Sequence, residues 1–112
     1  MAKARVCVVG SYNTDLMTRT VRMPAAGETV MGHSFRLGPG GKGSNQAVAA
    51  ARLGAEVSFV GKIGRDEFGE DALAFLTREG IDTSMLLRTE ASHTGTAHII
   101  VDDRGENLIV VS

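Results

Sequence analysis

The stretch over residues 38–54, GPGGKGSNQAVAAARLG, constrains the fold more than any other part of the chain. Four glycines and one proline fall within its first six positions, and small residues at helical spacing follow at once. Glycine permits a positive φ and lets another segment or a ligand approach the main chain closely. The pattern predicts a tight loop leading into a closely packed helix, with Ser44 or a residue just before it as the cap and Gly54 as the stop.

Polar side chains gather at the predicted start of this helix: Lys42, Ser44, Asn45 and Gln46. The first amide groups of a helix have no acceptor within it, and the helix dipole is positive there. Together these groups predict a donor-rich site for a hydroxylated or anionic small molecule. Two plainer interpretations stay open, a solvated loop charge for Lys42 and a purely capping role for Ser44.

A second set of polar residues follows the first predicted strand. Residues 5–10 form a continuous apolar run, typical of a strand buried on both faces of a parallel sheet, with Cys7 in the core. Asn13 and Asp15 come next, at the carboxyl end of the strand, where open α/β sheets bind ligands. In an extended chain both side chains point the same way and can grip vicinal hydroxyls. The alternative is a turn in which they satisfy only their own backbone.

The remaining pattern predicts an α/β core and two hairpins. Residues 56–61 and 82–87 are expected as strands, and residues 66–80 as a helix capped by Asp66. One hairpin, over residues 16–22 and 28–37, interrupts the first βα connection and is a candidate lid. The other joins residues 94–101 to residues 106–111. We expect the hairpins to form a layer separate from the main sheet.

Composition narrows the class of protein. The chain has 112 residues, 43% hydrophobic and 22% charged, with a net charge of −1, so we expect one modest domain and no nucleic-acid partner. No apolar run is long enough to cross a membrane, and the start of the chain has no signal-peptide pattern, so the expected location is cytoplasmic. Residues 107–112 read as a strand without a following turn, which indicates the front part of a longer protein.

Three familiar motifs do not fit. The glycines match G-x-G-x-x-G, but a hairpin separates them from the first strand, and the second strand is not followed by the acidic residue of a dinucleotide site. A phosphate-binding loop of the G-x-x-x-x-G-K-S/T type fails because Gly43 follows Lys42. The histidines, at positions 33, 93 and 98, have no metal-ligand spacing, so no metal site is expected within these residues.

Residues 40–54, GGKGSNQAVAAARLG, closely resemble the first signature of the ribokinases, within the PfkB-type carbohydrate kinase family. The resemblance extends to residues 8–15 (VVGSYNTD), 24–29 (PAAGET) and 61–69 (GKIGRDEFG). Residues 94–97 (TGTA) and 105–107 (GEN) are similar to the family's second lid hairpin. The likeness therefore covers nearly the whole chain.

The resemblance implies a fold and a substrate. The expected fold is the N-terminal part of a Rossmann-like, ribokinase-type three-layer α/β sandwich with a β-sheet lid. Residues of about 14–37 and 94–111 would form the lid, and residues 4–12 and 43–88 the core. The family phosphorylates sugars with MgATP, and ribokinases make ribose 5-phosphate. The residues implied as sugar contacts are Asn13, Asp15, Gly41, Lys42, Asn45, Ala97 and Ile99.

The resemblance also implies what this segment does not carry. The family's catalytic Asp lies in a G-A-G-D motif that does not occur here, and Ser44 replaces the family's usual Ala. The sites for ATP with Mg²⁺ and for a monovalent cation such as K⁺ are expected in a C-terminal part. We expect the 112-residue chain alone to be inactive and the complete enzyme to be a homodimer paired through its lids. The alternatives are another PfkB-type sugar or nucleoside kinase, and a non-catalytic dimerising or sugar-binding module.

Overall fold

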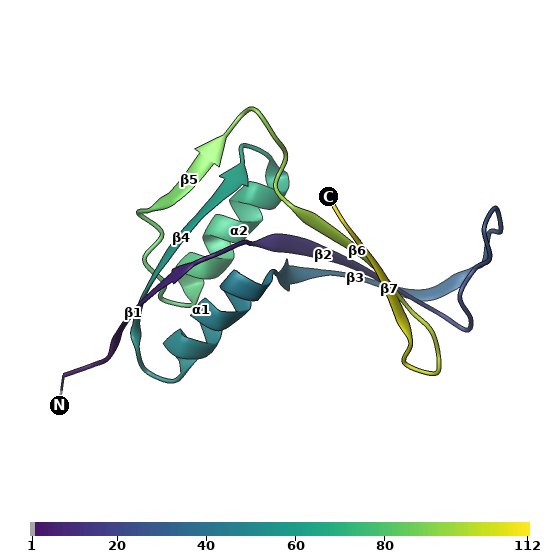
Figure 1. Cartoon of the computed structure of the whole chain (residues 1–112), viewed down its shortest axis with the longest axis horizontal. Helices are drawn as coiled ribbons and strands as arrows, with labels where there is room; N and C mark the ends of the chain where they lie inside the picture. Colours follow the sequence, from purple (N-terminus) through teal and green to yellow (C-terminus); the bar gives the residue numbers. More distant parts are fainter. Residues whose placement is uncertain (1) are drawn as a thin grey trace.

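The computed structural model describes residues 2–112, which build two separate β-sheets (Figure 1). The parallel core sheet has the order β1-β4-β5, and the mixed second sheet has the order β3-β2-β6-β7. The core strands are β1 (Arg5–Val9), β4 (Glu56–Gly64) and β5 (Leu86–Thr89), and the helices are α1 (Lys42–Arg52) and α2 (Glu67–Arg78). The second sheet contains β2 (Asn13–Thr20), β3 (Gly32–Gly40), β6 (Thr96–Val101) and β7 (Asn107–Val111). The predicted α/β class with a separate second sheet is confirmed.

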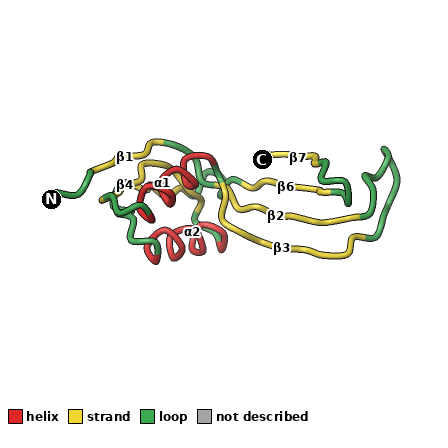
Figure 2. The backbone as a smooth tube through the Cα atoms, turned by 90° about the horizontal axis from the view of Figure 1, so that it is seen from below, coloured by secondary structure: helices red, strands yellow, loops and turns green. Residues whose placement is uncertain are grey.

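Both helices cover the same face of the core sheet (Figure 2). Phe59 and Ile63 of β4 are fully buried beneath them, together with Leu76 of α2. Ala47 of α1 and Ala72 of α2 have no exposed surface, and such small side chains let a helix axis approach a sheet closely. The alanine-rich sequence of α1 therefore allows this helix to pack tightly near its start, where it meets the second sheet.

The opposite face of β1 is not covered in residues 2–112, which corrects the prediction of a strand buried on both faces. Val9 is 77% exposed, and Cys7, expected in the core, is exposed as well. Side chains alternate across a strand, so a residue is buried only where something packs on its own face. Here α1 and α2 lie on the Val8 side alone.

The second helix begins as predicted. The Asp66 carboxylate accepts a hydrogen bond from the Gly69 amide at 2.8 Å and so caps α2. The strand predicted before this helix is longer than expected, since β4 continues to Gly64. The strand predicted at residues 82–87 is wrong, because β5 begins at Leu86 and Asp82 forms only an isolated bridge with Ser58.

The second sheet is two hairpins joined by a parallel pair. β2 pairs antiparallel with β3, β6 pairs antiparallel with β7, and β2 pairs parallel with β6. The predicted strand limits 16–22 and 28–37 are both shifted. β2 already begins at Asn13, and β3 continues to Gly40, because glycines of the expected loop pair in register with the start of β2.

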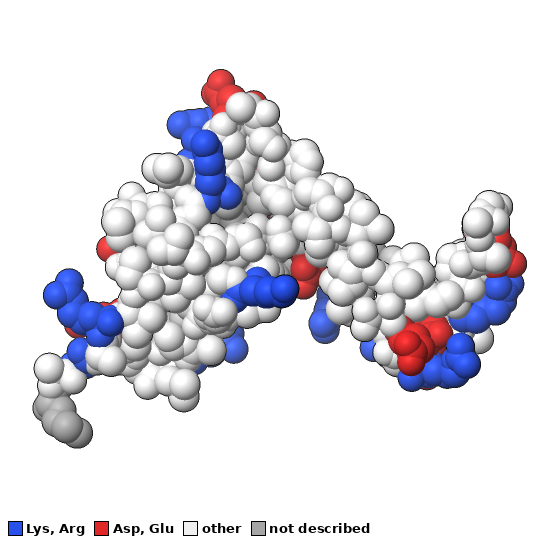
Figure 3. Space-filling model, in the orientation of Figure 1, with Lys and Arg blue, Asp and Glu red and all other residues white. Residues whose placement is uncertain are grey.

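Charged side chains of both signs lie at the far end of the second sheet (Figure 3). There Arg22 donates two hydrogen bonds to the Glu28 carboxylate, at 2.6 and 2.9 Å, and the Ala25 amide donates a third at 3.0 Å. The hydrogen bonds from Arg22, with that from Ala25, lower the pKa of Glu28 to about 2. These contacts hold the PAAGET segment in place within the β2–β3 connection.

Candidate functional site

The beginning of β2 and the end of β3 form the floor of the candidate site. The register places Asn13 opposite Gly40 and Asp15 opposite Gly38. The Asp15 carboxylate lies directly over Gly40, where any Cβ atom would overlap it. The Asn13 amide oxygen lies over Gly95 in the same way. Glycine is therefore required at positions 40 and 95 for these two side chains to keep their places.

The start of α1 packs against the connection between β1 and β2. Gly41 is the N-cap residue with φ 95°, and no side chain caps the helix, so of the two predicted possibilities Ser44 is not the cap and a residue before it takes that place. The Ser44 amide instead donates to the Ser11 carbonyl at 3.1 Å. A Cβ on Gly41 would lie 2.9 Å from the Asn13 nitrogen, so the glycine loop and the start of β2 are in direct contact.

The structure brings most of the predicted site residues to one place. Lys42 and Asn45 are exposed in the first turn of α1, next to Gly41. The amides of the first helical turn, Lys42 and Gly43, have no acceptor within the helix. Asn13 and Asp15 are half-buried beside this turn. The backbone at the start of α1 thus lies against the segment that carries Asn13, and Lys42 and Asn45 follow directly in that turn.

The apolar residues predicted to face the ligand lie on the next strand. Ala97 of β6 pairs with Asp15, and Ile99 pairs with Met17. Side chains of directly paired residues project from the same face of a sheet, so both apolar residues share the face of Asp15. Ala97 is 5% exposed and Ile99 is half-buried. One face of the second sheet therefore carries polar groups near the core sheet and apolar groups farther out.

The two polar side chains of β2 are not satisfied by the protein. Within residues 2–112, neither the Asp15 carboxylate nor the Asn13 side-chain amide has a hydrogen-bond or salt-bridge partner. Both residues belong to a regular strand, so the alternative of a self-satisfied turn is wrong. Burial raises the pKa of the Asp15 carboxyl. Half-buried polar groups without partners are suited to hydrogen-bond the hydroxyls of a ligand.

Comparison with known proteins identifies the family of the chain. The model of the pfkB family carbohydrate kinases matches residues 3–112. The chain belongs to this family. Mouse ribokinase is 50% identical over 96% of the chain, and Bacillus subtilis ribokinase is 49% identical over 95% of it. The chain spans 33% of the first relative and 36% of the second, about a third of their length.

Solved structures of the family share the fold. The ribokinase from Giardia lamblia superimposes with a TM-score of 0.91 at 38% identity, over 99% of this chain and 33% of that one. The Arabidopsis thaliana ribokinase in complex with ribose and ATP gives a TM-score of 0.83 at 31% identity, over 100% of this chain and 36% of that one. The predicted ribokinase-type fold is confirmed, and the described residues form a part of it.

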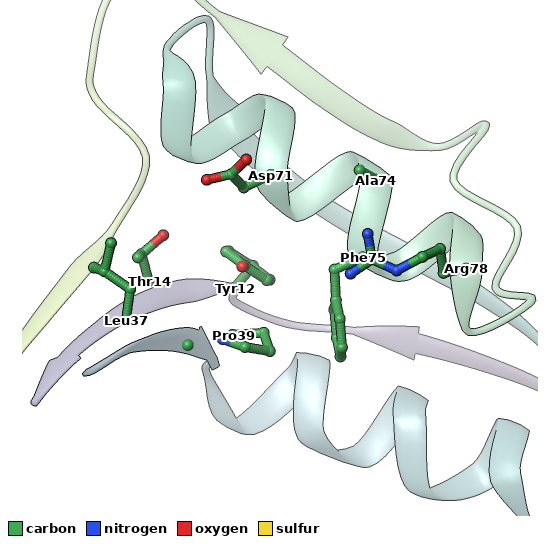
Figure 4. Close-up of a pocket in the computed structure, with 9 residues that line it drawn as sticks. Tyr12, Thr14, Leu37, Pro39, Asp71, Ala74, Phe75 and Arg78 are labelled. Carbon is green, nitrogen blue, oxygen red and sulfur yellow. The ribbon is translucent and has the colours of Figure 1, made fainter.

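A hollow on the other face of β2 is separate from this site. Tyr12 and Thr14 point into it, opposite to Asn13 and Asp15, and α2 closes it from above (Figure 4). Burial raises the pKa of the Tyr12 hydroxyl. The candidate site and this hollow therefore use alternate residues of the segment 12–15, which leads into β2.

Sequence reasoning did not assign roles to several glycines of the site. Gly40 and Gly95 support the two polar side chains of β2, and Gly10 and Gly43 touch backbone to backbone. The only signal in the sequence was the density of glycines beside the polar residues. Among residues 2–112 no group of three His, Cys, Asp or Glu side chains could hold a metal ion. No helix in that range has the length and apolar character needed to span a membrane.

We expect Ser44→Ala to leave the free energy of unfolding unchanged or to raise it by about 1 kcal/mol. Burying the Ser44 hydroxyl costs desolvation free energy, and no hydrogen bond offsets this cost. Ser44 is 1% exposed, and its hydroxyl has no hydrogen-bond partner within residues 2–112. Urea unfolding of the purified protein would measure the change, with Ser34→Ala on the exposed face of β3 as the control. A loss above about 1 kcal/mol would show that the Ser44 hydroxyl is bonded.

Proposed function

We propose that this chain is the sugar-binding segment of a ribokinase, and that the complete protein transfers the γ-phosphate of ATP to O5 of D-ribose. The observation that carries the proposal is the pair of polar side chains on β2. Asn13 and Asp15 have no partner within residues 2–112 and lie beside the amide end of α1. Two relatives named ribokinases, at 50% and 49% identity, support the same substrate.

Each predicted residue has a role in this proposal. Asp15 accepts hydrogen bonds from ribose hydroxyls, and Asn13 can both accept and donate. Lys42, Asn45 and the Gly41 backbone contact the sugar from the start of α1. The apolar contacts, Ala97 and Ile99, cover it from β6. The second sheet would act as a lid that keeps water out, so that phosphate is transferred to the sugar and not to water.

Catalysis in this proposal requires parts outside the described residues. Phosphoryl transfer depends mainly on positioning and on stabilising charge around the phosphate. The catalytic base, the MgATP site and a site for a monovalent cation such as K⁺ are assigned to the remainder of a full-length enzyme. Residues 2–112 alone are expected to show no kinase activity.

The second sheet is also the proposed dimer contact. Phe35 and Leu37 of β3 are 63% and 49% exposed, and Leu108 and Val110 of β7 are 57% and 65% exposed. Register places these side chains on the face opposite to Asp15. Exposed apolar side chains of this kind are typical of surfaces that pair with another protein. We assign them to a homodimer of a cytoplasmic enzyme.

The test is a sugar panel with the complete protein, MgATP and K⁺. We expect ADP formation that depends on ribose, and phosphorus NMR should identify ribose 5-phosphate. The 112-residue chain, assayed in parallel, should form no ADP. Preference for deoxyribose, fructose or a nucleoside would assign another activity within the family. No turnover with any of these substrates would leave a non-catalytic binding module.

A further inference from the structure

A buried hydrogen-bond network joins the core sheet to the second sheet. Thr94, which precedes β6, is completely buried. Its hydroxyl donates to the Asp66 carboxylate at 2.7 Å and accepts from the Gly64 amide at 2.9 Å. The other Asp66 oxygen accepts from the Thr94 amide at 2.8 Å. One residue is thus held by the end of β4 and by the cap of α2 at the same time.

Two glycines of the GRDEFG segment make room for this network. A Cβ on Gly64 would lie 2.6 Å from the Thr94 nitrogen, and one on Gly69 would overlap the Gly64 carbonyl. Burial by itself raises the pKa of Asp66, but the hydrogen bonds from Thr94 and Gly69 outweigh it and hold the pKa below its usual range. Charged, fully bonded groups of this kind fix a segment firmly.

The network continues into the candidate sugar site through Gly95. The Gly95 carbonyl accepts a hydrogen bond from the Thr14 amide at 2.8 Å, and the Gly95 Cα supports the Asn13 side-chain oxygen. Any shift of residue 94 therefore moves the surface on which Asn13 lies. Neither Asp66 nor Thr94 itself belongs to the set of proposed sugar contacts.

We propose that Asp66 and Thr94 are positioning residues for the sugar: they fix Gly95, and Gly95 fixes the Asn13 side chain at the junction of the two sheets. This inference rests on the proposed sugar-binding function and assigns that site two residues that do not touch the sugar. In this proposal the GRDEFG segment holds Thr94 in position and does not itself contact the sugar.

The test uses the complete protein with Thr94→Val, which keeps the shape of the side chain and removes its hydroxyl. The Gly64 amide then loses its acceptor, whereas the cap bond from Gly69 to Asp66 remains. We expect the KM for ribose to rise about tenfold and the KM for ATP to stay within about twofold. Thr94→Ser, which restores the hydroxyl, should return the KM for ribose to within about twofold of the parent.

Two controls separate positioning from general loss of stability. Leu76→Ala, in the core under α2, should lower the melting temperature but leave the KM for ribose within about twofold. In the Asn13→Ala background, Thr94→Val should change kcat/KM by less than about twofold, since the two residues would act as one unit. Additive effects of the two substitutions, or an unchanged KM for ribose in Thr94→Val, would overturn the proposal. If Thr94→Val does not fold, the same measurements are made on Asp66→Asn, and the same results support or overturn the proposal.

Hydrogen exchange tests the positioning without any substrate. In Thr94→Val the Thr14 and Gly64 amides should exchange at least about tenfold faster, while amides in the middle of α2 keep their rates. If the complete protein does not phosphorylate ribose but this exchange pattern is seen, the proposed function fails and the positioning network stands. Unchanged exchange at both amides would overturn the network itself.

Discussion

Asp15→Ala is expected to lower kcat/KM for ribose by about 100- to 1000-fold in the complete enzyme, because hydrogen bonds to a charged group contribute about 1.5–3 kcal/mol each and one carboxylate can hold two sugar hydroxyls. The carboxylate lies over Gly40, has no partner within residues 2–112, and is half-buried. In the proposed role of Asp15, its loss would leave the sugar hydroxyls without that acceptor. Steady-state kinetics with varied ribose at saturating ATP would measure the effect.

Two control variants show whether a change in kcat/KM comes from the charge of Asp15 or from the loss of any carboxylate. Asp15→Asn keeps the shape and removes the charge, so it should recover only a small part of the lost activity. Asp103→Asn changes an exposed carboxylate that pairs with His33 at 3.1 Å, far along the second sheet, and should leave kinetics unchanged. Burial raises the pKa of Asp15, so in the parent enzyme sugar binding should weaken as the pH falls through that pKa. An Asp15→Ala enzyme with kcat/KM within about tenfold of the parent would contradict the assigned role.

Gly41→Ala is expected to lower the free energy of unfolding by about 2–6 kcal/mol. Its φ is 95° and its ψ is 135°, a sparsely populated conformation that costs a residue with a side chain about 1–3 kcal/mol. Its Cβ would also lie 2.6 Å from the Ser11 carbonyl oxygen and 2.9 Å from two further backbone atoms. Backbone atoms cannot rotate away as a side chain can, and such overpacking adds about 1–3 kcal/mol.

Gly38→Ala is the matched control for this substitution. Gly38 lies in β3, shortly before Gly41, has no positive φ, and a Cβ there would meet nothing within 4 Å. We expect its free energy of unfolding to change by less than about 0.5 kcal/mol in urea titrations. Equal losses for the two variants would show that any side chain in the loop is harmful, and that the contact with Ser11 is not the cause.

Local patterns were sufficient to predict much of the fold. The alternation of apolar residues predicted both hairpins, and the small residues at helical spacing predicted the helix α1. Asp66 was predicted as the cap of α2 and is its cap. The same segments carry the signature that resembles the pfkB family, whose model matches residues 3–112. Each of these features depends on residues close together in the chain, so the sequence contains the required information.

Contacts between distant segments were decided only by the tertiary structure. Ser44 has the chemistry of a helix cap, but Gly41 takes that place because the start of α1 packs on the connection after β1. Cys7 lies in an apolar run, yet it is exposed because both helices pack on the other face of β1. These outcomes depend on which side of a strand is covered, and no short pattern records that.

By itself the sequence determined both helices and the approximate places of most strands, the family, and the polar residues that we propose for binding a sugar. The tertiary structure decided that Asn13 rests on Gly95 and Asp15 on Gly40, and that Asp66 reaches Thr94 across 28 positions of the chain. The physical reason is that hydrogen bonds and close backbone contacts need positions within a few tenths of an ångström. Such positions are fixed by the packing of whole elements and not by the preference of any single residue.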